Sequence, residues 1–283
     1  MNRNIQLLRR SGWDVLERCG KGSYGEVFRL RHSTTRQVVV IKRVNLNMMP
    51  GAREYWDEEV AVSTYLSRLD IRANGVLHPI APRVLQTYTC DEVEAGRHGT
   101  YGYMVMEELH MSMWDLFRHL QRVSMALAIE ATKMLFREQV LPILNVLASN
   151  YVMHLDAGPA NFMVRLYGSG LEGVRWIEDL PRIDVYLIDM GFALRFDQVT
   201  GALVSRVPPR PFRYYREFVN LYDMVFAQYK FEEMIRSHLH GTAPDQALSP
   251  TLAINAVGRA VYRNLCLAYA RHDHWQDNGL ARR

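Results

Sequence analysis

Residues 152–164 read VMHLDAGPANFMV, and this stretch decides the fold. A long helical pattern leads into it and a strand pattern leads out of it, which predicts a loop between the two. On that loop Asp156 and Asn161 stand five residues apart, so they can divide two tasks. The carboxylate can orient and deprotonate a hydroxyl while the amide oxygen binds a metal ion. We therefore predict a catalytic loop with Asp156 as the base, Asn161 as a metal ligand and His154 as a brace.

A second carboxylate follows the loop in the chain. Residues 185–191 read VYLIDMG, which predicts a buried strand that ends at Asp189 and is followed by Gly191. A carboxylate in this position suits a Mg²⁺ ion that bridges phosphates. Taken singly, His154 is equally typical of a core histidine and Asp189 of an ordinary turn. Their occurrence in one order along the chain favours a site over coincidence.

A glycine-rich pattern lies upstream, where residues 20–27 read GKGSYGEV. Glycines at these positions allow a hairpin to approach phosphate oxygens without an intervening Cβ, although the pattern alone is equally typical of a plain turn. The following strand pattern ends in VVIK at residues 39–42. Burying Lys42 at the end of an apolar strand is costly without an anionic partner. A phosphate together with a helix carboxylate would supply that partner.

The helix expected over residues 52–69 carries four acidic residues that could pair with the lysine: Glu54, Asp57, Glu58 and Glu59. We favour Glu59, because Val62 and Leu66 then lie on the same side of the helix at the i+3 and i+7 positions. Glu58 stays the alternative. Most of these carboxylates are expected to be solvated charges on the helix surface.

The overall pattern predicts an α+β fold with a β-rich first lobe and an α-rich second lobe. The chain has 283 residues, of which 48% are hydrophobic, enough for one large domain or two packed lobes. Strands are expected over residues 13–19, 26–31, 37–44, 83–89 and 101–106, with a loop over 90–100. Helices are expected over residues 114–123, 126–149, 214–238 and 249–271. The domain boundaries expected are an N-terminal extension over 1–12, an N-lobe over 13–107, a hinge over 107–113 and a C-lobe over 114–283.

The composition narrows the choice of partners. The formal net charge is only +4 and no aromatic–basic motif occurs, so we do not expect nucleic acid as a partner. The sequence contains no stretch of about 18 apolar residues, so it predicts no membrane-spanning helix. The three cysteines, Cys19, Cys90 and Cys266, are too sparse for a disulfide framework or a zinc site. We therefore expect a reducing compartment, the cytoplasm or the nucleus.

Over about residues 13–230 these motifs resemble those of the eukaryotic-like protein kinase superfamily. The resemblance implies a two-lobed fold with a shortened C-lobe, and it implies ATP and Mg²⁺ or Mn²⁺ as cofactors. It implies catalytic roles for Asp156, Lys42 and Glu59, and metal binding by Asn161 and Asp189. It also implies a set of ATP-binding residues: Gly20, Gly22, Gly25, Val27, Val40, Lys42, Met106, Glu107, Leu109 and Met163. In this resemblance Asp223 matches the helix aspartate that anchors the catalytic loop.

The chain departs from the family pattern at two loop positions. Leu155 stands where the family carries an arginine, so we expect activity that does not depend on phosphorylation of the segment after Asp189. Gly158 stands where the family carries a lysine, so a positive charge on the transferring phosphoryl group is missing. Arg165, Arg195 or an arginine within residues 206–213 is expected to replace it. The loop pattern H-x-D-x-x-P-x-N without the lysine also resembles herpesviral kinases, which would place the protein in a host cell or virion.

Three functions fit the sequence. The first is a protein serine/threonine kinase whose partners are a nucleotide and a protein substrate. The second is a pseudokinase that binds a nucleotide or a partner and transfers nothing, which the departures at Leu155 and Gly158 favour. The third is a small-molecule kinase of the aminoglycoside or choline type, which has a similar loop. The complete glycine-rich pattern ahead of Lys42 favours a protein substrate, and serine or threonine is preferred over tyrosine on frequency alone.

Overall fold

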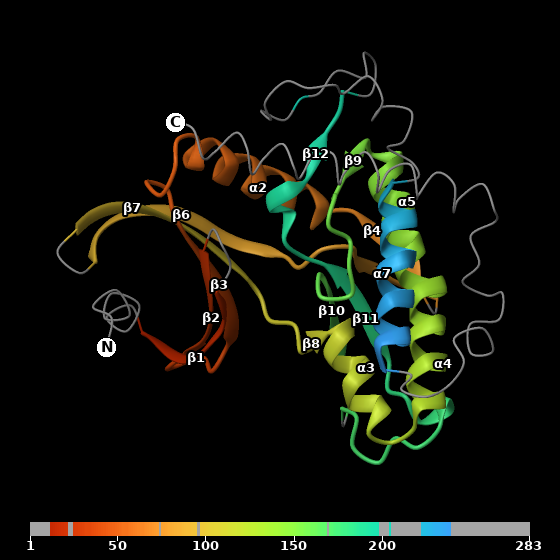
Figure 1. Ribbon diagram of the computed structural model, residues 1–283. Coiled ribbons are helices and arrows are strands. Elements are labelled where there is room, and N and C mark those ends of the chain that lie inside the picture. The colour runs from red at the N-terminus through yellow and green to blue at the C-terminus, as the bar shows by residue number, and fades with distance from the viewer. Residues whose placement is uncertain are drawn as a thin grey trace.

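The structure is a computed structural model, and it describes residues 12–21, 25–73, 75–94, 97–168, 170–197, 204 and 222–238. Figure 1 shows a curved sheet and one helix, α2, forming one lobe, with the other helices gathered in a second lobe. This arrangement confirms the predicted two-lobed α+β fold. The helix expected over 249–271 and the first part of that expected over 214–238 lie outside the described residues.

Five antiparallel strands form the N-lobe sheet in the order β1-β2-β3-β7-β6. They are β1 (Trp13–Lys21), β2 (Gly25–His32), β3 (Val38–Asn45), β6 (Val84–Glu94) and β7 (Arg97–Glu107). Alternation along the strands gives the sheet two faces. One face buries an apolar cluster that includes Leu30, Val39 and Ile41. The other face packs against α2 (Ala52–Leu66).

A close approach fixes α2 on the sheet. Trp56 of α2 is buried and packs in one cluster with Val44 and Met104. A Cβ built on Gly102 of β7 would lie 2.4 Å from the Trp56 ring. Only glycine leaves room for the indole at this point, so the small residue sets the distance between helix and sheet.

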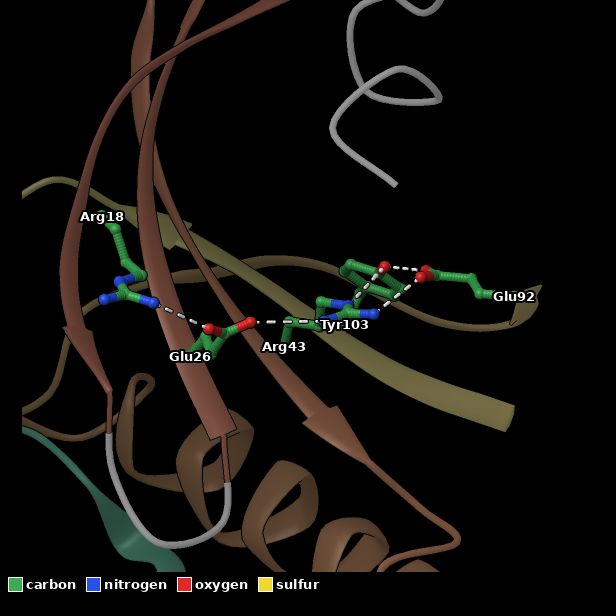
Figure 2. A network of polar contacts seen from close by, with 5 residues as sticks. All are labelled: Arg18, Glu26, Arg43, Glu92 and Tyr103. Carbon is green, nitrogen blue, oxygen red and sulfur yellow. Dashed lines mark hydrogen bonds and ion pairs between the residues drawn. The ribbon is translucent and has the colours of Figure 1, made fainter. Parts of the chain in front are cut away.

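The prediction of a loop over residues 90–100 was wrong, because β6 and β7 continue through this range and form a hairpin. Glu92 is buried in that hairpin although it is an acidic residue. Figure 2 shows why: Arg43 Nη2 lies 2.8 Å from Glu92 Oε2, and the Tyr103 hydroxyl also donates to Glu92. Glu26 joins the network through Arg43 and Arg18. Ion pairs across the sheet thus stabilise β6 and β7, although acidic residues are uncommon in strands.

A second hairpin, β4 (Asp70–Ala73) and β5 (Val76–Pro79), follows α2 and was not predicted. Gly75 lies in its turn with φ at 77°, a conformation that favours glycine. Beyond the strand Met111–Ser112 (β8), the C-lobe helices are α3 (Met113–Gln121), α4 (Met125–Leu135), a π-helical turn at Phe136–Val140, α5 (Leu141–Ser149) and α7 (Tyr222–His238). No helix among the described residues is long and apolar enough to cross a membrane.

The helix expected over 126–149 is continuous but contains the π-helical turn. Gln139 in that turn is fully buried and bonds to β11 (Ile183–Leu187). Its side-chain amide donates to the Ile183 carbonyl at 2.6 Å and accepts from the Val185 N–H at 2.7 Å. The turn therefore ties the helix to the strand that leads to Asp189.

The centre of the C-lobe is α7. Phe231 of α7 is fully buried, with its ring centroid 5.1 Å from that of Phe136 and 5.8 Å from that of Phe162. Phe162 begins β10 (Phe162–Leu166), which pairs with β11. The loop over residues 154–161 connects β9 (Val152–Met153) to β10, so the packing of α7 positions this loop.

Candidate active site

The sheet face that carries Lys42 also carries the apolar residues expected around adenine. In the strand register Val27 lies opposite Lys42, and Val40 lies opposite Met106. Directly opposed residues share a face, and so do residues two apart on one strand. The structure therefore brings these four side chains together on one surface.

The glycine-rich turn joins β1 to β2. A Cβ built on Gly20 meets no described atom within 4 Å, so the turn is open at that point. A Cβ on Gly25 would lie 2.4 Å from the Arg43 carbonyl oxygen, so this glycine is required by the neighbouring strand. Gly22 lies outside the described residues.

Lys42 connects the two lobes through a pair of carboxylates. Its Nζ lies 2.5 Å from Glu59 Oε1 and 2.8 Å from Asp189 Oδ1. Glu59 is 7% exposed, so its charge is shielded from water and stabilised by the ammonium. Glu58 instead lies 3.8 Å from Arg195 Nε. The structure therefore pairs Lys42 with Glu59, the carboxylate favoured by the helix pattern.

The charges of this group shift the pKa values of its members. Burial alone would lower the pKa of Lys42, but the Glu59 and Asp189 carboxylates outweigh it and raise that pKa. Burial alone would raise the pKa of Asp189, but the Lys42 ammonium outweighs it and lowers that pKa. These two shifts favour the charged forms, whereas burial outweighs the Lys42 ammonium at Glu59 and raises the pKa of that carboxyl.

The predicted catalytic loop brings Asp156 and Asn161 into contact. The Asn161 amide donates to the backbone carbonyl of Asp156 at 2.8 Å and to its carboxylate at 2.9 Å. Asp156 is exposed, so its other carboxylate oxygen is accessible to a substrate hydroxyl. The Ile188 N–H donates to the Asn161 carbonyl at 2.9 Å. This bond places Asn161 beside the strand end that carries Asp189.

Asp223 at the start of α7 fixes the backbone of the loop through hydrogen bonds. Its carboxylate accepts from the N–H of His154 at 2.6 Å and from the N–H of Leu155 at 2.9 Å. Leu155 has φ at 67°, a left-handed conformation that is strained for leucine. Two charge-assisted hydrogen bonds offset the strain. The structure thus places Asp223 where the sequence resemblance expected an anchor.

His154 is fully buried, and its ring connects two segments. Its Nδ1 accepts from the Asp156 N–H at 3.2 Å, so its Nε2 carries the proton and donates to the Ile188 carbonyl at 2.8 Å. The imidazole therefore braces the loop against the segment before Asp189.

The segment expected to be the hinge carries two acidic side chains that reach opposite lobes. Glu107 accepts from the Arg83 N–H at 2.9 Å, and its other oxygen lies 2.9 Å from Arg165 Nη2 on β10. Glu108 forms an ion pair with Arg29 on β2. Arg165 also donates to the Glu108 carbonyl at 3.2 Å. Arg165, one candidate for the missing loop charge, is thus engaged at the hinge.

The two remaining expected adenine contacts flank this hinge. Leu109 follows it and is 9% exposed, while Met163 lies on β10 opposite Ser112 of β8. The arginines within residues 206–213 lie outside the described residues.

Sequence reasoning missed Lys230 of α7, whose side chain lies against Gly158. A Cβ built on Gly158 would lie 3.9 Å from both Cβ and Cγ of Lys230. The available signal was its spacing: Lys230 comes two helical turns after Asp223, on the same side of the helix.

The side chains fit a nucleotide with a divalent cation. Asp189 offers a carboxylate that is 48% exposed, and no described residue donates a hydrogen bond to the side-chain oxygen of Asn161. Carboxylate and amide oxygens are suitable ligands for a hard cation such as Mg²⁺. Together with the lysine and the open turn at Gly20, this arrangement can hold phosphate groups next to an exposed carboxylate base.

Comparisons with known proteins point the same way. Residues 13–207 match the family model described as protein kinase domain. A probable serine/threonine-protein kinase of Dictyostelium discoideum is 27% identical over 189 residues, covering 67% of this chain and 31% of that protein. The inhibitor of nuclear factor kappa-B kinase subunit beta of Bos taurus is 22% identical over 191 residues, covering 66% of this chain and 21% of that protein. The chain thus spans less than a third of the length of these relatives.

Proposed function

The chain belongs to the protein kinase family, and from that premise we propose that it transfers the γ-phosphoryl group of ATP to a Ser or Thr hydroxyl of a protein. The observation that carries this proposal is the position of Lys42, held between Glu59 and Asp189 across the two lobes. An ammonium with this support is ready to bind phosphate oxygens.

In the proposed reaction each side chain has one task. Lys42 holds the α- and β-phosphates, and Glu59 keeps the ammonium in place. Asp156 orients the substrate hydroxyl and takes its proton as the oxygen bonds to phosphorus, while ADP leaves with the bridging oxygen. Asn161 and Asp189 would hold the cation, for which we propose Mg²⁺ with Mn²⁺ as the alternative. When bound, that cation neutralises charge on the phosphate oxygens.

Adenine is proposed to lie between the lobes. Val27, Val40 and Met106 share the sheet face above it. Leu109 and Met163 would contact it from the hinge and the C-lobe. The Glu107 N–H donates to the Arg83 carbonyl, so the backbone carbonyl of Glu107 would accept a hydrogen bond from adenine. The open turn at Gly20 supports an approach of the phosphates on the same side.

The finer parts of the proposal rest on other observations. The choice of Ser and Thr follows the name of the Dictyostelium relative. The proposed lobes are residues 13–107 and 114–283, with the hinge over 107–113. Cys19 and Cys90 both carry free thiols, which fits the cytoplasm or the nucleus.

The test is transfer from labelled ATP, with Mg²⁺ or Mn²⁺, to the protein itself and to a generic basic protein. Lys42→Met is the control, and transfer that disappears in it is the expected result. Leu155 and Gly158 favour a second candidate, a pseudokinase that binds nucleotide and transfers nothing. Nucleotide binding without transfer by the wild-type protein would support that candidate.

A further inference from the structure

Gly158 occupies a central place in the loop but contributes no charge. Its N–H donates to the Asp156 carbonyl at 2.8 Å, and its carbonyl accepts from the Asn161 N–H at 2.9 Å. The residue thus lies between the proposed base and the proposed metal ligand. A cation at this position would lie close to the phosphoryl group during transfer, and glycine leaves that place without one.

The side chain of Lys230 lies beside the place where a side chain at position 158 would begin. A Cβ on Gly158 would lie 3.9 Å from Lys230 Cβ and 3.9 Å from its Cγ, an ordinary van der Waals distance. Apart from the chain neighbours of Gly158, no other atom of the described residues lies within 4 Å of that point. Two methylene groups and the ammonium extend beyond Cγ, so the charge can reach outward from a point next to Gly158.

The position of Lys230 relative to the loop is fixed by α7. Two turns earlier, Asp223 accepts backbone hydrogen bonds from His154 and Leu155. The next residue, Phe231, is fully buried in the core of the lobe. A helix held at both points cannot slide along the loop, so Lys230 stays beside Gly158.

The ammonium of Lys230 has a weak partner. It lies 2.9 Å from Glu233 Oε2, and the two side chains are 38% and 51% exposed. The Phe226 and Tyr229 rings lie 5.9 Å and 5.7 Å from it. Exposed ion pairs contribute little free energy because water and salt screen them. An anionic phosphoryl group can therefore displace Glu233.

Other cationic side chains near the site form ion pairs with other residues. Lys42 binds Glu59 and Asp189, and Arg165 binds the hinge. Arg195 lies beside Glu58 on α2. None of these three side chains lies within 4 Å of a Cβ built on Gly158.

We propose that Lys230 supplies the positive charge that position 158 lacks, by donating a hydrogen bond to an oxygen of the transferring phosphoryl group. This inference rests on the proposed kinase activity. Lys230 stays protonated throughout, so it changes neither the atoms nor the electrons that are exchanged. Its effect is electrostatic, since a fixed cation stabilises the charge of the transition state.

The first experiment compares kcat for Lys230→Met, for Lys230→Met combined with Gly158→Lys, and for Lys133→Met. Lys133 lies on α4 and serves as the matched control. Lys230→Met is expected to lower kcat about a hundredfold and to raise the KM for ATP about tenfold, because the lysine would contact the phosphoryl group both before and during transfer. Gly158 does not have a positive φ, and a Cβ there would meet Lys230 only at an ordinary van der Waals distance, so the backbone accepts a side chain at this position. The double variant is expected to recover most of the lost kcat.

A fourth variant, Glu233→Gln, separates catalysis from structure. Removing the partner frees the ammonium, so kcat is expected to stay the same or rise. If Lys230 served only its ion pair with Glu233, both single variants would lose activity equally, and the lysine at 158 would restore nothing. That outcome, or an unchanged kcat in Lys230→Met, would overturn the inference.

Nucleotide binding decides the question even if the wild-type protein transfers nothing. A lysine that contacts the γ-phosphate distinguishes ATP from ADP. Lys230→Met is then expected to weaken ATP binding about tenfold while ADP binding stays the same, and Gly158→Lys is expected to reverse the loss. Equal effects on both nucleotides would reject the role of Lys230, while absent transfer alone would reject the proposed activity.

Discussion

The group around Lys42 and the loop around Asp156 are built on opposite plans. In the first, charged side chains bind one another directly, and Lys42 lies between two carboxylates. In the second, the main contacts involve the backbone, because Asp223 and His154 accept hydrogen bonds from N–H groups of the loop. The side chains proposed to hold phosphate and the carboxylate proposed to act as the base therefore have separate supports, so substitutions should affect binding and transfer separately.

The sharpest separation is expected from Asp156→Asn. The exposed carboxylate is not part of the ion-pair group, so its loss should lower phosphate transfer about 10²–10⁴-fold and leave ATP affinity unchanged. Transfer from labelled ATP and nucleotide titration measure the two quantities. Asp70→Asn, an exposed change on β4, is the control. Equal loss of transfer and binding would refute the role given to Asp156.

Lys42→Met should have the next largest effect, and it should appear in stability as well as in transfer. The change leaves Glu59 buried without a cation, which costs about 3 kcal/mol of the free energy of unfolding. Lys42→Met combined with Glu59→Gln should recover part of that loss, because no buried charge stays unpaired. Denaturant unfolding measures both variants. A Lys42→Met protein as stable as the wild type would show that the group contributes no net stability.

The ion pairs of Lys42 with Glu59 and Asp189 should make the free energy of unfolding depend on pH. The raised pKa of Lys42 means that its stabilisation is complete below its ordinary value of 10.5 and is lost as pH rises through the raised value. The lowered pKa of Asp189 means that its share is present above its ordinary value of 3.8 and is lost as pH falls through the lowered value. Burial raises the pKa of Glu59 in spite of the Lys42 ammonium, and Lys42→Met removes that ammonium, so the carboxylate should take up a proton more readily in the variant. The stability difference between wild type and Lys42→Met should therefore grow as pH rises from acid toward neutral, as Glu59 becomes charged. A difference that stays constant over that range would contradict the shift of Glu59.

The smallest effect is expected from Thr200→Ala combined with Ser205→Ala. Both residues lie outside the described part of the chain. Leu155 cannot bind a phosphate as an arginine does, so removing these hydroxyls should change transfer less than about twofold. Phosphate transfer by the double variant measures this. Lost activity in a folded protein would mean that another cation performs the task.

The local parts of the site could be predicted from the sequence. Helical spacing was enough to favour Glu59 over Glu58, and the order of motifs was enough to indicate the loop. The strands over 83–89 and 101–106 were predicted, but their extension through residues 90–100 was missed because Glu92 is buried by its pairing with Arg43, 49 residues away. Lys230 was missed for the same reason, since its contact with Gly158 exists only when α7 packs under the loop. Local pattern cannot indicate contacts that depend on the packed lobe.

The segment expected to act as the hinge has a consequence for the proposed reaction. Glu107 forms an ion pair with Arg165 in one lobe and Glu108 forms one with Arg29 in the other, so two ion pairs oppose separation of the lobes. All four side chains are partly exposed, and dissolved ions therefore weaken both ion pairs. We expect the segment to become less stiff as ionic strength rises, and the proposed reaction to release a product held between the lobes faster in salt without any change at the reacting atoms.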